Sequence, residues 1–376
     1  MADFFQDFKF EKKSQVKIYY PQKQELADFL ARLNLFSQES ANILITDENL
    51  AALHLDFVLD CLANLGIKVF PIVVPASEDS KSLETYGECI SKILNIGIDK
   101  YSSIVSFGGG VVNNLAGFIA STLYRGIQLV HIPTTLLSQA DAAVDVKQAI
   151  NSTFAKNSIG SYYPPTAVII CVDFLNTLPE RFLIDGFAEV IKHALCQDYS
   201  FYQELLTQDP FAWDPARMNS VIRKSVSLKL DIMSEYESSA NDPFLYNEAI
   251  KQYGHALGHA IEHASENEML HGEAIAIGMA FSAFAANKLG LCSEELLSQH
   301  VSVLKHYRLP FTVPAELEAD KIIYHVKYDK HYYDGKVSLG LLTRVGEPHR
   351  EGDSYFSRVR IQDFASLLDD YKNYPL

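Results

Sequence analysis

The chain has 376 residues, enough for about two to three domains of roughly 150 residues each. Its 32 Lys and Arg against 47 Asp and Glu give a net charge of −15, which argues against binding to nucleic acid or to an anionic membrane surface. With 48% hydrophobic and 21% charged residues, the composition is that of a globular protein, not a disordered one. A site for an anionic substrate would therefore need a local concentration of basic side chains.

The cysteines and the apolar segments bear on the cellular compartment. The five cysteines are scattered and form no CxxC pair, which favours buried thiols in a reducing compartment over disulfides or a Cys metal site. Residues 1–7 lack the basic start and apolar run of a signal peptide. The longest apolar stretch, residues 274–286, is too short to span a bilayer and predicts a buried helix. We expect a soluble, cytoplasmic protein with no membrane partner.

Strand-like and helix-like segments alternate along the first half of the chain. The predicted strands are residues 42–46, 67–74, 103–107, 128–132 and 167–172. The predicted helices are residues 50–65, 84–94 and a segment from Gly110 through residue 120. Strands separated by helices predict a parallel sheet with right-handed crossovers, as in a Rossmann-like α/β domain.

Helical periodicity dominates the second half. The predicted helices are residues 179–196, 215–235, 246–263, 271–288 and 294–307, with one late strand element at residues 337–342. The change in period near residue 178 predicts two domains. We expect an α/β domain over residues 1–177 and a mostly helical domain over residues 178–376.

A triple-glycine run follows the third predicted strand and opens a helix. Backbone N–H groups of Gly108, Gly109 and Gly110 and the helix N-terminus are suited to phosphate oxygens, although a plain tight turn explains the run equally well. Asp47, at the end of an early strand, is suited to a ribose hydroxyl, but it also fits a helix N-cap. Together these features favour a dinucleotide site.

Four of the chain's twelve histidines fall within seventeen residues. His255, His259 and His263 are spaced four apart, on one face of a predicted helix, and His271 begins the next helix. Two imidazoles and one carboxylate form the ligand set of a catalytic zinc with an open position. The carboxylate candidates are Glu189, Glu262 and Glu273, and a polar helix face without metal remains the alternative.

Several basic residues lie near these motifs: Arg125, Lys147, Lys156, Lys192, Lys229 and Lys330. Each alone reads as a solvated surface charge. Arg125, Lys147 and Lys156, however, have apolar or glycine neighbours rather than charged ones, which suggests a phosphate or other anion as partner. A metal, a nucleotide and an anion pocket in one chain indicate an enzyme.

Together these motifs resemble the dehydroquinate synthase superfamily, the sugar phosphate cyclases, from about Asp47 to Gly346. The matching motifs, in family order, include Gly-Gly-Gly-Val-Val, Ile-Pro-Thr-Thr-Leu-Leu, Lys-Asn-Ser-Ile-Gly, Ala-Glu-Val-Ile-Lys, Gly-His-Ala-Leu-Gly-His-Ala-Ile-Glu and His-Gly-Glu-Ala. The resemblance implies a Rossmann-like NAD domain, a helical metal domain and an active site in the cleft between them.

The resemblance also implies roles for individual residues. The metal ligands would be Glu189, His255 and His271, holding zinc or, in its place, cobalt. NAD would contact Asp47, Glu78, Lys81, Gly108, Gly109, Gly110, Asn114, Thr134 and Thr135. Positions for substrate contact, phosphate contact or proton transfer are Arg125, Asp141, Lys147, Lys156, Asn157, Lys192, Lys229, His259 and Lys330. Family members are often homodimers, so a homodimer is expected.

The departures from the dehydroquinate synthase pattern concern the substrate. That pattern has Gly-Gly-Lys-Thr at residues 145–148, Asp at Asn114 and a carboxylate-gripping Arg at Glu248. Lys-Gln-Ala-Ile-Asn, Asn114 and Tyr-Tyr-Pro-Pro at 162–165 instead resemble 2-deoxy-scyllo-inosose synthases, which cyclise glucose 6-phosphate. Gln252 departs from both groups, which carry Asn or Glu there. Glu248 is expected to repel a carboxylated substrate.

The resemblance implies transient oxidation of a sugar phosphate by NAD, phosphate elimination, re-reduction and an intramolecular aldol closure. The net reaction is that of a lyase acting on a phosphate. Glucose 6-phosphate is the leading substrate. The alternatives are a 3-dehydroquinate synthase, a sedoheptulose 7-phosphate cyclase, a metal-dependent alcohol dehydrogenase that would accumulate NADH, and an inactive relative.

Overall fold

The computed structural model of the protein describes residues 14–153, 156–207, 209–234, 246–266 and 268–376. Residues 1–7, expected not to form a signal peptide, lie outside this set. The chain forms two compact units: unit 1 is Met1–Pro133 with Asp145–Cys171, and unit 2 is Thr134–Val144 with Val172–Leu376. The linear boundary after residue 177 stays a prediction, and this division differs from it in residues 134–144 and 172–177. The expected cleft between the domains also stays a prediction.

Unit 1 is built on a six-stranded sheet whose strands are all parallel. In spatial order the strands are β1 (Lys17–Tyr19), β8 (Ala167–Ile169), β5 (Gln128–Pro133), β4 (Ser103–Gly108), β2 (Ala41–Asp47) and β3 (Lys68–Val74). The parallel sheet predicted from the alternating pattern is confirmed. Since β3 and β4 flank β2 on opposite sides, the direction of winding reverses between β2 and β4.

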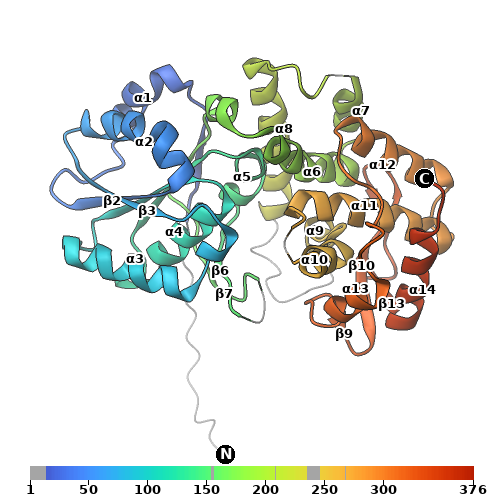
Figure 1. The fold of residues 1–376 in the computed structure, drawn as a ribbon. Coiled ribbons are helices and arrows are strands. Elements are labelled where there is room, and N and C mark those ends of the chain that lie inside the picture. Colours follow the sequence, from blue (N-terminus) through green and yellow to red (C-terminus); the bar gives the residue numbers. More distant parts are fainter. Residues whose placement is uncertain (1–13, 154–155, 208, 235–245, 267) are drawn as a thin grey trace, which may run out of the picture. The chain divides into compact units, whose positions relative to one another are not determined.

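Helices cover both faces of this sheet, with α1 and α2 above it and α3 and α4 below it in Figure 1. Their bounds are α1 (Leu26–Leu33), α2 (Glu48–Ala63), α3 (Leu83–Ile96) and α4 (Gly110–Thr122). Apolar side chains of α3 and α4 pack on one face in a core that includes Ile43, Ile104 and Leu115. The hairpin of β6 (Lys147–Ile150) and β7 (Ile159–Tyr162) packs on α4, where a Cβ on Gly117 would meet Gln148.

Unit 2 is mostly helical, as expected. Its helices are α5 (Leu136–Ala140), α6 (Glu180–Gln197), α7 (Tyr199–Thr207), α8 (Pro215–Ser234), α9 (Tyr246–Lys251), α10 (His255–Ala264), α11 (His271–Lys288), α12 (Glu294–His306), α13 (Ala319–Val326) and α14 (Ile361–Lys372). Its short strands are β9 (Tyr332–Tyr333), β10 (Lys336–Gly340), β11 (Leu342–Arg344), β12 (Glu347–Pro348) and β13 (Phe356–Arg360). Residues 274–286 are buried in α11, which confirms the predicted buried helix.

Short 3₁₀ turns join several of these elements. They are η1 (Lys23–Glu25), η2 (Glu78–Ser80), η3 (Leu123–Arg125), η4 (Ala142–Val144) and η5 (Val172–Thr177). Segment 134–144 belongs to unit 2 because α5 packs closely on α6. A Cβ on Gly186 of α6 would lie 2.5 Å from the Leu137 backbone nitrogen.

The single helix predicted over residues 246–263 is wrong, because the structure breaks it into α9 and α10. Gly254 interrupts the helix with a φ of +78°, a conformation that glycine adopts without a steric penalty. A Cβ at this position would also lie 2.8 Å from Met279 of α11. The break therefore lets α10 start beside α11.

Two further features are the state of the cysteines and the apolarity of the helices. All five cysteines are free thiols, and four of them are buried. Across the described parts of the chain, no helix combines the length and apolarity needed to cross a membrane.

Candidate active site

Three predicted metal ligands come together within unit 2, and we call Glu189, His255 and His271 the open triad. Glu189 lies in the middle of α6, whereas His255 and His271 are the first residues of α10 and α11. Glycines allow α10 and α11 to approach closely, since a Cβ on Gly278 would lie 1.9 Å from the Gly254 carbonyl oxygen. Packing of the two helices thus brings both imidazoles to one place.

Asp185 attaches the start of α11 to α6. Its Oδ1 accepts hydrogen bonds from the backbone N–H groups of Gly272 at 2.6 Å and Glu273 at 3.2 Å. Burial raises the pKa of Asp185 to about 6, although these bonds oppose the shift. Because Asp185 lies one helical turn before Glu189, the same contact aligns His271 with Glu189.

The open triad has the spacing of a metal site. The Nε2 atoms of His255 and His271 each lie 3.6 Å from Oε1 of Glu189. A tetrahedral ion with bonds of about 2.0–2.1 Å separates its ligand atoms by about 3.4 Å. Glu189 is buried, and its Oε1 has no hydrogen-bond donor among the described residues. A buried carboxylate oxygen facing two imidazole nitrogens without a hydrogen bond fits a divalent cation.

The Nδ1 atoms of His255 and His271 have their own polar contacts, which leave the Nε2 atoms facing Glu189. His255 Nδ1 lies 3.0 Å from the Tyr253 carbonyl oxygen, and His271 Nδ1 lies 3.4 Å from Glu262 Oε2. A proton on each Nδ1 leaves the Nε2 lone pair for a metal. Burial lowers the pKa of His255 well below its usual range. Burial also acts against protonation of His271, but Glu189 and Glu262 outweigh it and raise that pKa to about 10, so a bound metal would replace the proton on its Nε2.

Lys192 lies next to the open triad, one turn after Glu189. Its ammonium contacts Glu189 Oε2 and donates to the Lys251 carbonyl oxygen at 3.2 Å. Burial opposes ionisation of Glu189, yet Lys192 holds its pKa down at about 2. The carboxylate is therefore ionised, as a metal ligand must be.

A second polar group, which contains two histidines, lies beside the open triad. We call its members the closed cluster: His259, Asp329, His331 and Gln252. Its atoms are directly hydrogen-bonded: His259 Nδ1 lies 3.0 Å from Asp329 Oδ2, and His331 Nδ1 contacts Asp329 Oδ1. His331 Nε2 lies 3.0 Å from Gln252 Oε1. The His259 ring centroid is 5.1 Å from that of His255. His259, Asp329 and His331 also lie close enough together for a metal ion, but the direct hydrogen bonds to Asp329 favour a proton-carrying network.

A third buried group joins α5, α6 and α8. Asp141 Oδ1 lies 2.8 Å from Lys229 Nζ and 3.3 Å from His193 Nε2, and His193 Nδ1 lies 2.7 Å from Ser225 Oγ. Burial opposes ionisation of Asp141, but Lys229 and His193 hold its pKa well below the usual range. His193 therefore has a buried bridging position between Asp141 and Ser225.

The other two carboxylate candidates for the metal have different contacts. Glu262 contacts the far nitrogen of His271, so it orients a ligand. Glu273 pairs with Arg181 and accepts from the Leu270 N–H at 2.9 Å, which closes the start of α11. Glu189 is thus the carboxylate that faces both imidazoles.

In unit 1, the predicted dinucleotide residues gather at the carboxyl ends of β2 and β4. Asp47 ends β2 and Gly108 ends β4, at the point where the sheet winding reverses, which is the usual ligand position in such sheets. Gly109 caps α4 without a side-chain hydrogen bond, so backbone N–H groups are left for an anion. Asp47 also caps α2, accepting from Leu50 N–H at 3.0 Å.

The remaining predicted NAD contacts are tied into local structure. Glu78 accepts from Asn151 Nδ2 at 2.9 Å, and Lys81 contacts Asn157. Asn114 accepts from the Ala149 N–H at 3.1 Å, which joins α4 to β6. Thr134 and Thr135 belong to unit 2, where Thr135 caps α5.

The predicted substrate residues divide between the units. In unit 1, Lys147 begins β6, Lys156 lies in the turn before β7, and Arg125 is exposed with a φ of +64°. Unit 2 holds the others: Asp141, Lys192, Lys229, His259, Lys330, Glu248 and Gln252. Glu248 is paired with the buried Lys251 at 3.3 Å, a partner that sequence reasoning missed.

Sequence reasoning also missed Asp329 and His331. Both flank Lys330, which was singled out, so the pattern Asp-Lys-His was available as a signal.

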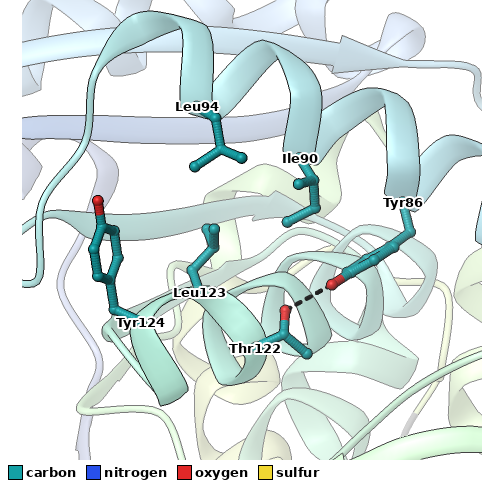
Figure 2. Close-up of a pocket in the computed structure, with 6 residues that line it drawn as sticks. All are labelled: Tyr86, Ile90, Leu94, Thr122, Leu123 and Tyr124. Carbon is teal, nitrogen blue, oxygen red and sulfur yellow. Dashed lines mark hydrogen bonds between the residues drawn. The ribbon is translucent and has the colours of Figure 1, made fainter.

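One surface groove lies on unit 1, and its lining residue Tyr124 directly precedes Arg125. Figure 2 shows it between α3 and the end of α4, with a volume near 400 Å³ and one internal hydrogen bond, of 2.9 Å, from the Tyr86 hydroxyl to Thr122. Its lining consists of Tyr86, Ile90, Leu94, Thr122, Leu123 and Tyr124. It contains no acid, base or phosphate-binding cation, so it offers no chemistry for catalysis.

Comparison with known proteins identifies the family of the chain. The 3-dehydroquinate synthase N-terminal family matches residues 71–185, and the 3-dehydroquinate synthase C-terminal family matches residues 186–332. A 3-dehydroquinate synthase of Geobacillus thermodenitrificans is 38% identical over 309 residues, which cover 81% of this chain and 82% of the relative.

Two solved structures extend the comparison. One is 2-deoxy-scyllo-inosose synthase complexed with carbaglucose-6-phosphate, NAD+ and Co2+, at 27% identity and a TM-score of 0.83, covering 94% of this chain and 96% of that one. The other is 2-epi-5-epi-valiolone synthase from Streptomyces hygroscopicus with NAD+ and Zn2+ bound, at 24% identity and a TM-score of 0.84, covering 98% and 99%. This second likeness concerns the fold alone.

The chain belongs to the 3-dehydroquinate synthase family. It is an enzyme of that family and a sugar phosphate cyclase of the dehydroquinate synthase superfamily.

Proposed function

We propose that this enzyme is an NAD- and divalent-metal-dependent cyclase of the 2-deoxy-scyllo-inosose synthase type, acting on glucose 6-phosphate as a carbon–oxygen lyase. Metal dependence is supported by the open triad, whose buried carboxylate faces two imidazoles with no hydrogen bond between them. The choice of substrate is supported by Glu248, a carboxylate at the position where the dehydroquinate synthase pattern has an arginine. The solved 2-deoxy-scyllo-inosose synthase with a glucose 6-phosphate analogue, NAD+ and Co2+ supports it.

Glu189, His255 and His271 would hold zinc or cobalt, and the β2–β4 edge with Asp47 and the three glycines would hold NAD. When bound, NAD supplies a hydride acceptor and donor, and the metal stabilises negative charge on a substrate oxygen. Glu78, Lys81, Asn114, Thr134 and Thr135 are proposed as further NAD contacts.

The chain's own residues would handle protons and anions. Lys192, almost fully buried beside Glu189, would donate a hydrogen bond to a substrate hydroxyl. His259 would exchange a proton at Nε2, because its Nδ1 is engaged by Asp329. Further substrate or phosphate contacts are proposed for Arg125, Asp141, Lys147, Lys156, Asn157, Lys229, Gln252 and Lys330.

Substrate choice centres on Glu248. The Lys251 ammonium, 3.3 Å away, balances its charge, so simple repulsion of a carboxylate is weaker than the sequence suggested. What this position lacks is the planar, two-pronged guanidinium that binds a carboxylate through two hydrogen bonds. An uncarboxylated sugar phosphate therefore fits this position better.

A 3-dehydroquinate synthase activity is the second candidate. It is favoured by the curated relatives, which carry that name at 34–38% identity.

A cytoplasmic homodimer is also proposed. The five free thiols support a reducing compartment, and the family resemblance supports the dimer.

The test is phosphate release by the zinc-loaded protein with NAD, comparing glucose 6-phosphate, sedoheptulose 7-phosphate and the carboxylated precursor of dehydroquinate. We expect release from glucose 6-phosphate without net NADH. Release only from the carboxylated precursor would establish the second candidate, and release only from sedoheptulose 7-phosphate would also overturn the proposal. NADH accumulation without phosphate would indicate an alcohol dehydrogenase.

A further inference from the structure

His331 is a buried side chain with both ring nitrogens engaged. It is 6% exposed, its Nδ1 contacts Asp329 Oδ1, and its Nε2 lies 3.0 Å from Gln252 Oε1. An ionised carboxylate only accepts hydrogen bonds, so the proton must be on Nδ1 of His331. This conclusion holds for either orientation of the Gln252 amide, because turning the amide changes only the role of Nε2.

Asp329 is fixed by residue 331 from two directions. Its Oδ1 accepts from the His331 backbone N–H at 2.8 Å and from the His331 ring. Its other oxygen, Oδ2, faces His259 Nδ1 at 3.0 Å. Burial would raise the pKa of Asp329, but the two histidines hold it well below the usual range. The carboxylate is thus ionised and aimed at His259.

This orientation determines the tautomer of His259. A carboxylate oxygen at Nδ1 requires the proton there, which leaves the Nε2 lone pair to accept a proton. The His259 ring lies 5.1 Å from that of His255 and 6.0 Å from that of His271, centroid to centroid. His259 is therefore held beside the open triad in the form that a general base requires.

Gln252 connects the same network to the metal-ligand helix. The backbone carbonyl oxygen of Gln252 accepts from the backbone N–H of His255 at 3.0 Å, while the Gln252 side chain contacts His331. The segment after α13 and the first turn of α10 are thereby joined through one buried imidazole.

We propose that His331 is a positioning residue that orients Asp329 and thereby keeps His259 in its Nδ1–H tautomer, with Gln252 fixing the opposite edge of the ring. The proposal rests on the proposed function, because His259 is the proton-transfer group of that function. His331 itself touches no reacting atom in this account.

Two amide variants separate the functions of the two ring nitrogens. In His331→Asn the side-chain amide can replace Nδ1 and donate to Asp329, whereas in His331→Gln it reaches the Nε2 position and contacts Gln252. Both have similar polarity, so they form a matched pair. A role limited to packing would affect them alike.

The first readout is the tautomer of His259, measured by nitrogen-15 NMR of histidine side chains in the zinc-loaded protein and assigned with a His259→Gln variant. We expect Nδ1–H in the wild type and in His331→Asn, and a mixture or Nε2–H in His331→Gln. Nε2–H in the wild type would overturn the proposal, even if neither variant folds. This readout needs no substrate, so it stands apart from failure of the proposed function.

The second readout is phosphate release from glucose 6-phosphate. We expect kcat to fall at least about 10-fold in His331→Gln, with KM changed by less than about twofold and with kcat of His331→Asn within about threefold of wild type. Equal losses in both variants, or a loss confined to KM, would contradict a positioning role. If the wild type releases phosphate from none of the three sugar phosphates, the proposed function fails while the tautomer result remains.

Discussion

The open triad and the closed cluster are neighbouring groups of histidine and carboxylate with opposite designs. In the open triad, the two Nε2 atoms each lie 3.6 Å from Glu189 Oε1, and the Nδ1 atoms face Tyr253 and Glu262. In the closed cluster, Asp329 accepts directly from both imidazoles. We infer that the same residue types are suited to a cation or to a proton according to which imidazole nitrogen faces the carboxylate.

Removing one carboxylate charge from each group should separate the two groups most strongly. Glu189→Gln should weaken zinc binding by more than about 100-fold, because a primary ligand is lost. Asp329→Asn is the matched control and should keep about one zinc per chain. Metal analysis after dialysis measures both. Equal zinc loss in the two variants would contradict the distinction between the groups.

A smaller change tests the outer contact of the open triad. Glu262→Gln should weaken zinc binding by about 10- to 100-fold, because the amide orients the His271 ring less strongly than a carboxylate does. Competition with a chelator measures the affinity. An affinity unchanged from wild type would show that His271 is oriented by its helix alone.

A third prediction concerns the pH dependence of stability at a buried histidine outside both groups. His300 Nε2 lies 2.8 Å from the Tyr253 hydroxyl and Nδ1 lies 2.8 Å from the Leu296 carbonyl oxygen. Burial lowers the pKa of His300 to about 4, against the opposing bond to Leu296. The unfolded state, with an ordinary histidine pKa near 6.5, binds a proton that the folded state excludes.

Stability should therefore fall as pH drops from about 6.5 to 4, by up to about 1.4 kcal/mol per pH unit from this residue. Urea unfolding across this range measures it, with His300→Gln as the comparison. The variant should show a shallower slope than wild type. Identical slopes would mean that His300 is protonated in the folded protein.

The sequence supported the architecture where local patterns were strong. Alternating β-branched runs and helices predicted the parallel sheet, and small apolar residues predicted the buried core of α11. The break at Gly254 was not predicted, because the periodicity continues across it. Close packing against Met279, a long-range contact, explains the glycine there.

The candidate site, too, was predictable from the sequence only in part. The spacing of His255 and His271 suggested a metal, but three carboxylates remained equal until the family resemblance favoured Glu189. Glu262 and Glu273 are carboxylates that could also bind a metal, but Glu262 contacts Nδ1 of His271 and Glu273 contacts Arg181. Only the packing of the helices reveals these contacts. His331 adjoins Lys330 in the sequence, but its contact with Gln252, 79 residues earlier in the chain, is visible only in the structure.

We propose that the open triad, and not the closed cluster, holds the divalent ion of this enzyme. The most direct test is anomalous diffraction at the zinc edge from crystals of the zinc-loaded protein. We predict one strong peak bonded to Glu189 and to the Nε2 atoms of His255 and His271. A peak among His259, Asp329 and His331, with none at the open triad, would contradict the account.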